Sequence, residues 1–328
     1  MVTRSLSLAL ALAASTFALP AMAEPLKVVA SFSILGDMVK QIGGDDVAVT
    51  TLVGPDGDAH VFEPTPRDAK ALGEAKVLVE NGLNFESWMP RLVKTSGFSG
   101  ETVIASTGVK PRDLTPEEEA AEEAEEAHAH KGEAHADHDH DHAGHGHGHD
   151  HGSQDPHAWQ SLTNGQIYAK NIAEGLAKAD PENAADYRAR GEAYIAEMKA
   201  MDEKVRQEIA SVPEAQRVIV TSHDAFGYFG EAYHVRFIAP QGVSTEAEAS
   251  AQDVAKIIDQ IREQKIGAVF VENISDPRLI DQISRETGAK AGGALFSDAL
   301  SPPDGPAPTY LDMFRNNADE IVKALKTS

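Results

Sequence analysis

The chain has 328 residues, 52 acidic and 29 basic side chains, a formal net charge of −23 and no cysteine. Its acidity argues against nucleic acids and anionic membrane surfaces as partners, because both bind basic patches. The lack of cysteine excludes disulfide bonds and thiolate metal ligands.

The first 23 residues have the pattern of a secretory signal. Arg4 precedes an apolar stretch from Leu6 to Leu19, and Ala21-Met-Ala23 supplies the small residues of a cleavage site. The apolar stretch is too short for a membrane span, and no cysteine stands at the cleavage site to carry a lipid. We therefore predict a signal peptide at residues 1–23 and a soluble periplasmic protein from about Glu24, without a membrane anchor.

Strands and helices alternate in the first half of the mature chain. The predicted strands are Leu26–Ser31, Val47–Val53, Lys76–Glu80 and Thr102–Ala105, and the predicted helices between them are Ile34–Ile42, Pro66–Glu74 and Phe85–Thr95. Alternation at this spacing predicts a parallel sheet, so the fold class is α/β. We assign residues 24–180 to an N-terminal lobe.

Residues 116–152 interrupt this lobe with a run of glutamates followed by a histidine-rich run. The segment contains almost no large apolar side chain, so it cannot bury enough surface to order itself and is predicted to be a mobile insertion. It holds ten of the 14 histidines, namely His128, His130, His135, His138, His140, His142, His145, His147, His149 and His151.

The histidines of the insertion follow one another mostly at i, i+2, which does not place them on one face of a helix. Neutral imidazoles bind zinc, copper and nickel readily, but ordering the chain around an ion costs roughly 1–2 kcal/mol per fixed residue. The pattern favours several weak, interchangeable metal sites. The alternative is a solvated loop without a role.

A long helix and a second lobe follow the insertion. Residues 181–213 lack an internal proline and place apolar side chains at mainly helical spacing, which predicts a linking helix. Residues 214–328 are assigned to a C-terminal lobe. Its predicted strands are Arg217–Thr221, Val235–Ala239, Ala268–Val271 and Lys290–Phe296, and its predicted helices are Ala225–Ala232, Ala251–Gln264, Pro277–Thr287 and Tyr310–Lys326.

Three of the four remaining histidines follow predicted strands or the insertion. His60 lies after the strand Val47–Val53, His223 lies after Arg217–Thr221, and His157 stands in DPHAW where the insertion ends. Asp298 has an equivalent position after Lys290–Phe296. In parallel α/β sheets the strand ends form the ligand crevice, so these four side chains are candidates for one site between the lobes.

Three imidazoles and one carboxylate form a shell that suits tetrahedral Zn²⁺. The set offers no sulfur for Cu(I) and too few oxygens for Ca²⁺ or Mg²⁺. Spacing alone does not settle the role of these residues, because a histidine near a strand end is often only packed or hydrogen-bonded. We assign His234, which lies between a predicted helix and strand, to such a structural role.

Several motifs together resemble one family. These are VVASFSILGDMVKQIGGD, HVFEPTPRDAKAL, NGLNFESW, DPHAW, TSHDAFGYF, VFVENISDPRLI and TYLDMFRNNADEIVKAL. They are similar to the cluster A-I metal-binding substrate-binding proteins of ABC transporters, in particular the ZnuA-like zinc-binding proteins. The resemblance implies two (β/α) lobes with parallel-sheet cores, one long backbone helix, and a metal site at the lobe interface formed by His60, His157, His223 and Asp298.

The resemblance also implies zinc as the transported ion. Manganese members carry glutamate where this chain has His223, and the harder Mn²⁺ favours oxygen. Some zinc members place an acid directly before the first histidine, but this chain has Ala59 there, which leaves Asp58 outside the site. The missing cysteine pair and the stretch DPHAWQSLTNG resemble the AztC-type branch, and this resemblance implies that a periplasmic metallochaperone supplies the zinc.

The sequence thus predicts a monomeric periplasmic zinc-binding protein, not an enzyme, that delivers Zn²⁺ to the ABC permease of a zinc importer. The alternatives are a carrier of manganese or another divalent metal, a histidine-rich buffer or adhesin, and a zinc hydrolase. A hydrolase keeps an open metal position for water, whereas Asp298 is expected to fill it here. Asp155, Asp224 and Glu272 are candidates to orient the imidazoles, although each could equally cap a helix or solvate a loop.

Overall fold

The computed structural model describes residues 24–115, 118–119 and 154–327. The predicted signal at residues 1–23 and the ten histidines of the insertion lie outside the described residues. Within the described ranges, no helix is long and apolar enough to span a membrane.

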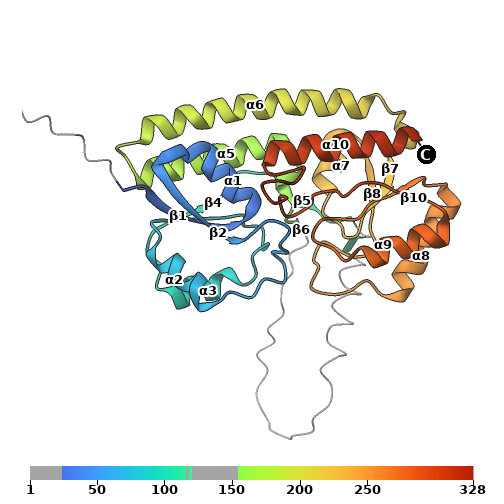
Figure 1. The fold of residues 1–328 in the computed structure, drawn as a ribbon, viewed down its shortest axis with the longest axis horizontal. Coiled ribbons are helices and arrows are strands. Elements are labelled where there is room, and N and C mark those ends of the chain that lie inside the picture. Colours follow the sequence, from blue (N-terminus) through green and yellow to red (C-terminus); the bar gives the residue numbers. More distant parts are fainter. Residues whose placement is uncertain (1–23, 116–117, 120–153, 328) are drawn as a thin grey trace, which may run out of the picture.

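The first half is built on a parallel sheet with strand order β2-β1-β3-β4 (Figure 1). Its strands are β1 (Leu26–Phe32), β2 (Val47–Val53), β3 (Val77–Glu80) and β4 (Glu101–Ile104). Successive residues of β1 face opposite sides: Val28 packs in the main core, and Val29 packs with Leu72 in a smaller one. Helices therefore cover both faces of the sheet. Helices α1 (Ser33–Gly43) and α5 (Leu162–Ala179) lie on one, and α2 (Pro66–Glu74) and α3 (Met89–Ser96) lie on the other.

The second half repeats this plan with strand order β10-β9-β7-β8. Its strands are β7 (Val218–Val220), β8 (Arg236–Ile238), β9 (Ala268–Val269) and β10 (Lys290–Ala291). Helices α7 (Gly227–Tyr233) and α10 (Tyr310–Thr327) pack on one face, and α8 (Ala251–Gln264) and α9 (Pro277–Thr287) pack on the other. The predicted α/β class with two parallel-sheet cores is confirmed.

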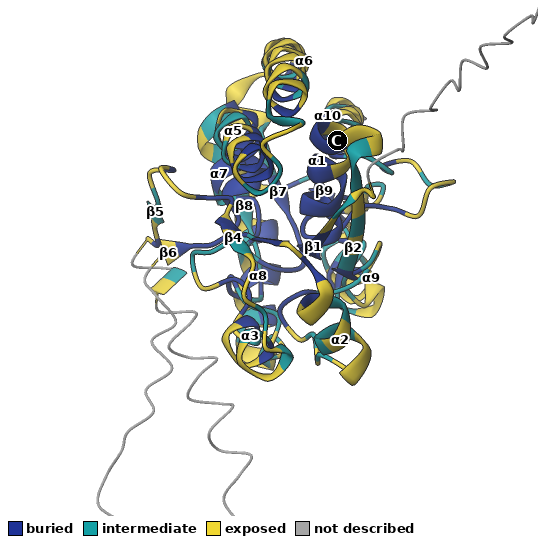
Figure 2. Cartoon of the chain, turned by 90° about the vertical axis from the view of Figure 1, so that its left-hand side faces the viewer, coloured by how far each residue is buried: buried dark blue, intermediate teal, exposed yellow. Residues whose placement is uncertain are grey.

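Helix α6 (Ala184–Ala210) runs along both halves (Figure 1), and Figure 2 shows it at the outer edge of the molecule with exposed residues on its outer side. Its 27 residues span roughly 40 Å. The helix can approach α5 closely because Gly191 has no side chain, and a Cβ there would come within 2.9 Å of the Cβ of Ala173. The helix lies inside the predicted range 181–213.

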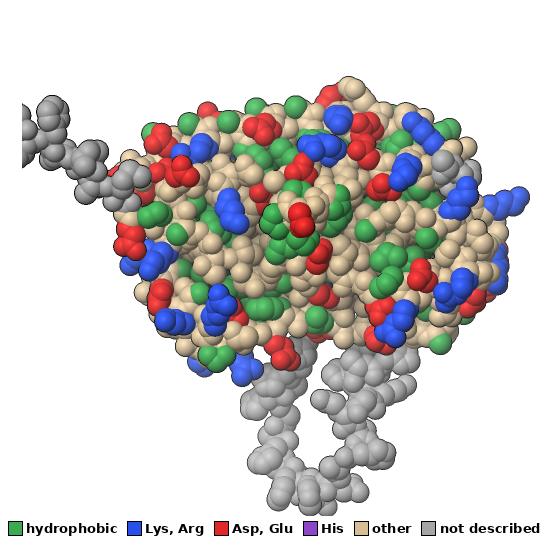
Figure 3. Space-filling view, in the orientation of Figure 1, with side chains coloured by type: hydrophobic (Ala, Val, Ile, Leu, Met, Phe, Trp, Pro, Cys, Tyr) green, Lys and Arg blue, Asp and Glu red, His purple; other side chains and the backbone are tan. Residues whose placement is uncertain are grey.

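The charged side chains are spread over the surface of both halves. Figure 3 shows acidic and basic groups interspersed across one face of the molecule, with no large area of a single sign. The excess of acidic residues is therefore not gathered into one patch on this face.

One α-helix was not predicted, and several predicted elements differ in extent from those of the structure. Helix α5, which carries the buried Tyr168 and Ile172, was not predicted. The helix expected at Phe85–Thr95 begins only at Met89, and it is preceded by a turn in which Leu83 and Asn84 adopt left-handed backbone conformations. The strand expected at Lys290–Phe296 ends at Ala291.

A short antiparallel pair frames the insertion and was also not predicted. Strand β5 (Arg112–Asp113) pairs with β6 (Gln154–Asp155). The chain therefore leaves and re-enters the described fold at adjacent strands, and β6 leads directly into His157.

Candidate metal centre

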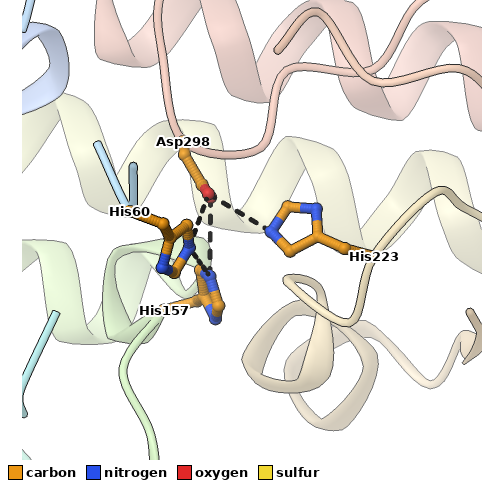
Figure 4. Close-up of side chains that lie close together, drawn as sticks. All are labelled: His60, His157, His223 and Asp298. Carbon is orange, nitrogen blue, oxygen red and sulfur yellow. Dashed lines mark hydrogen bonds and ion pairs between the residues drawn. The ribbon is translucent and has the colours of Figure 1, made fainter. Parts of the chain in front are cut away.

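Four buried side chains from four separate segments meet between the two halves of the molecule. They are His60 after β2, His157 after β6, His223 after β7 and Asp298 after β10 (Figure 4). Three of them follow strands of the two parallel sheets, whose carboxyl ends form the ligand crevice in α/β proteins. The structure thus brings together all four candidate ligands.

The distances between their polar atoms match the edges of a small coordination shell. Asp298 Oδ2 lies 3.2 Å from Nε2 of His60 and 3.2 Å from Nε2 of His223. Nε2 of His157 lies 3.6 Å from Asp298 Oδ1 and 3.4 Å from Nε2 of His60. A tetrahedron with Zn–N and Zn–O bonds near 2.0–2.1 Å has edges of roughly 3.3 Å. One ion of that size fits between these atoms.

The carboxylate of Asp298 contacts the three imidazoles but no hydrogen-bond donor outside the cluster among the described residues. The residue is fully buried. Buried polar atoms are almost always hydrogen-bonded, and a buried charge needs a counter-charge. The three imidazoles face this carboxylate, so the arrangement fits a bound cation.

Two of the three imidazoles are oriented by a second carboxylate. Asp155 Oδ1 accepts hydrogen bonds from the backbone N–H of His157 at 2.9 Å and from its Nδ1 at 2.8 Å. Glu272 Oε2 lies 2.5 Å from Nδ1 of His223. A carboxylate at Nδ1 places the proton there and leaves Nε2 free for a metal. The sequence named both carboxylates as candidates, and the structure pairs them.

The loop that carries Asp298 is held by residues next to His157. The indole N–H of Trp159 donates to the carbonyl oxygen of Ser297 at 2.9 Å, and Gln160 Nε2 donates to the same oxygen at 2.6 Å. Sequence reasoning did not assign these two residues, although they follow His157 closely in DPHAWQ. They fix the acidic ligand of one half relative to the histidine of the other.

The remaining candidates lie outside the cluster. Asp58 accepts a hydrogen bond from the backbone N–H of His60 and another from Thr245, so it orders the loop. Asp224 faces Glu118 and Asp155 rather than an imidazole, and burial together with these two carboxylates raises its pKa to about 8. His234 ends α7 in a left-handed backbone conformation, and its side chain is exposed rather than packed as expected.

The electrostatics of the cluster couple metal binding to protons. Burial alone would lower the pKa of His157, but Asp298 and Asp155 raise it to about 9. In His223 burial is likewise outweighed by Glu272 and Asp298, which raise its pKa. Burial would raise the pKa of Asp298, but the two imidazoles hold it well below its usual range. In the metal-free protein at neutral pH, the carboxylate therefore faces the protonated imidazoles of His157 and His223.

Metal binding at this cluster is expected to release protons. A metal needs neutral imidazole, so loading at about pH 7 should displace about two protons, one each from His157 and His223. Titration calorimetry in two buffers with different ionisation enthalpies measures this number. Metal affinity should rise with pH up to about 9, because the metal-free histidines then lose their protons. A heat that is independent of the buffer would contradict the prediction.

The same pKa shift makes the stability of the metal-free protein fall as the pH rises, whereas metal affinity increases. The folded pKa of His157 lies above the reference value of 6.5. Its contribution to the free energy of unfolding is therefore fully present below about pH 6.5 and is lost as the pH rises through about 9.

Access to the cluster lies beside His60. This residue is 7% exposed, while the other three candidate ligands are at 0%. A pocket of about 50 Å³ adjoins His60 and is also lined by Gln154. Gln154 is the first described residue after the insertion, so the chain leaves the insertion at the mouth of the site.

Comparison with known proteins identifies the family of the chain. The sequence profile of ZnuA, the periplasmic component A of a zinc-uptake complex, matches residues 28–324. The chain belongs to the ZnuA family. Members of this family are metal-binding substrate-binding proteins of ABC transporters and are not enzymes. The two sheets, the helices around them and the buried cluster are consistent with that membership.

The ZnuA-family relatives bear the names of different metals. The iron-binding protein YfeA of Yersinia pestis is 31% identical over 301 residues, which cover 92% of this chain and 86% of YfeA. The manganese-binding lipoprotein MntA of Halalkalibacterium halodurans is 30% identical over 302 residues, or 92% of this chain and 89% of MntA.

Solved structures show the same fold. The periplasmic zinc-binding protein TroA of Treponema pallidum has a TM-score of 0.77 at 30% identity and covers 92% of this chain and 99% of its own. The Mn-bound periplasmic metal-binding protein of Candidatus Liberibacter asiaticus has a TM-score of 0.73 at 29% identity, covering 92% of this chain and 100% of its own. The chain is thus a periplasmic metal-binding component of an ABC transporter.

Proposed function

We propose that this protein is a zinc carrier that binds one Zn²⁺ between His60, His157, His223 and Asp298 and delivers it to the ABC permease of a zinc importer. The observation that carries the proposal is the fully buried Asp298 carboxylate, which faces three imidazole Nε2 atoms at 3.2 to 3.6 Å. A single dication satisfies all four groups.

The ligand chemistry favours zinc over the other metals of the relatives. Three nitrogen donors and one carboxylate suit tetrahedral Zn²⁺. Manganese prefers oxygen donors and a larger coordination number, and only Asp298 offers oxygen in this set. Competition between Zn²⁺ and Mn²⁺ for the same site decides between these metals. A preference for Mn²⁺ would instead support the alternative function, a carrier of manganese or another divalent metal.

We further propose that the insertion at residues 116–152 collects zinc and passes it to this site. The insertion contains ten histidines, and Gln154, two residues beyond it, lines the pocket beside His60. Weak sites close to the mouth would raise the local zinc concentration there.

Four further features remain predictions from the sequence: the AztC-type branch, the metallochaperone, the cleaved signal without an anchor, and the monomeric state. Lipoproteins occur among the relatives, so the anchor needs its own test by mass spectrometry of the mature protein.

Deleting Glu117–Gly152 should separate the two kinds of binding. We expect zinc titration calorimetry on residues 24–328 to show one tight event and several weak events, and the deletion variant to keep only the tight one. As the pH falls towards about 6, the weak events should disappear first, because exposed imidazoles near their reference pKa become protonated. If the deletion abolished all binding, the insertion would be the site and the protein a histidine-rich buffer.

A further inference from the structure

A half-buried arginine stands next to the candidate ligands without belonging to them. The side chain of Arg112, on β5, is 10% exposed and contacts three carboxylates. They are Glu118 at 2.6 Å, Asp155 at 3.3 Å and Glu231 at 3.3 Å. Removing a guanidinium from water is costly unless it is paired, and here the partners come from three separate segments.

Arg112 and a candidate metal ligand share the carboxylate of Asp155. Asp155 Oδ2 pairs with the guanidinium of Arg112, and Oδ1 accepts from Nδ1 and the backbone N–H of His157. The rotation of this carboxylate sets the rotation of the imidazole. A planar guanidinium restrains a carboxylate better than an ammonium group can.

Glu272, the carboxylate that contacts His223 in the other half, needs no arginine to hold it. Glu272 Oε1 accepts two backbone N–H groups, those of Ser222 and His223, each at 2.8 Å. Rigid backbone therefore fixes Glu272 directly. Asp155 accepts a backbone hydrogen bond from His157 itself, so its orientation relative to the rest of the fold depends on Arg112.

Arg112 also binds the second half of the molecule. Its backbone N–H donates to the hydroxyl of Tyr228 at 2.8 Å, and that hydroxyl lies 3.1 Å from the carbonyl oxygen of Asp155, to which it donates. Helix α7 starts at Gly227, where a Cβ would come within 2.5 Å of Asp155 Oδ2 and 2.6 Å of the guanidinium. The arginine–aspartate pair thus packs against the first turn of α7.

We propose that Arg112 is the positioning residue of His157. It holds Asp155 against α7, and Asp155 then keeps Nε2 of His157 directed at the position of the metal. The inference rests on the proposed function, because it assigns a role within the same metal site. Loss of the carboxylate partner of a ligating imidazole weakens metal affinity by about 10- to 100-fold, and loss of Arg112, which acts through that carboxylate, should cost up to the same factor.

Four variants test the role by competition of Zn²⁺ with a fluorescent chelator. Arg112→Met should weaken zinc binding by up to about 100-fold. Arg112→Lys should weaken it less, because lysine keeps the positive charge but lacks the planar guanidinium with its several donors. Asp155→Asn should weaken binding to a similar extent. If Arg112 acts through Asp155, the double variant Arg112→Lys/Asp155→Asn should bind about as well as Asp155→Asn alone.

A matched control is available in a second arginine. Arg190 donates to the carbonyl oxygens of Ile42 and Gly43 and pairs with Asp46, away from the metal cluster. Arg190→Lys should change the thermal unfolding temperature without changing zinc affinity. The visible spectrum of bound Co²⁺, which reports coordination geometry, should change in the Arg112 variants and not in Arg190→Lys.

The outcomes separate this inference from the proposed function. Wild-type affinity and spectrum in both Arg112 variants, or fully additive losses in the double variant, would overturn the role of Arg112 while leaving the zinc site intact. Absence of a tight site that depends on His223 in the wild-type protein would overturn the proposed function itself. Should Arg112→Met fail to fold, as judged by circular dichroism, Arg112→Lys and the double variant still decide the matter.

Discussion

Replacing His223 by alanine is expected to abolish the tight zinc event while leaving the weak ones. His223 is fully buried, and its Nε2 lies 3.2 Å from Asp298 Oδ2. Its removal takes away a ligand and also leaves Glu272 without its charge partner. Loss of an outer-shell partner alone costs about 10- to 100-fold in metal affinity, so loss of the ligand should cost more than about 100-fold. Calorimetry with Zn²⁺ on the variant measures the change.

His234 supplies the control for this variant. It lies in the same half, has an exposed side chain and adopts a left-handed backbone conformation that asparagine tolerates well. His234→Asn should bind zinc as the wild type does. If His223→Ala retained the tight event, the buried cluster would not be the site.

Replacing Asp298 by asparagine is expected to give the second large loss. The change preserves the shape of the side chain but removes the carboxylate that the three imidazoles share. Zinc affinity should fall by more than about 100-fold, by the same comparison with outer-shell partners. A histidine-rich buffer without an interlobe site would show almost no change, so zinc competition on this variant distinguishes the two functions.

The same variant has a measurable consequence without metal. In the wild-type protein the charges of Asp298 and Asp155 raise the pKa of His157. Without the Asp298 charge, that pKa should fall, and fewer protons should be released on metal binding. Calorimetry in two buffers therefore provides a readout in addition to affinity. An unchanged proton count would show that Asp298 does not set the protonation of the imidazoles.

Much of the molecule follows from its sequence. Apolar and β-branched runs such as Val47–Val53 form strands at the predicted positions, because period-two burial against helices requires that pattern. Helices such as Ala251–Gln264 have the predicted bounds, since Ser250 caps the first turn. His60, His223 and Asp298 could be named from the sequence, because polar residues after parallel strands lie at the carboxyl edges of the sheets. His157 follows β6 instead and was named from its place where the insertion ends.

Other features were decided only by the tertiary structure. Which carboxylate orients which imidazole depends on contacts between segments far apart in the chain, such as Glu272 with His223. The sequence did not distinguish Asp155, Asp224 and Glu272 as candidates. The folded structure places Asp155 and Glu272 against imidazoles and Asp224 against other carboxylates. The role of Arg112 was invisible in the sequence for the same reason, since its partners Glu118, Asp155 and Glu231 meet it only through folding. Local patterns determine elements and ligand types, whereas the direction of a buried side chain is determined by the neighbours that the fold supplies.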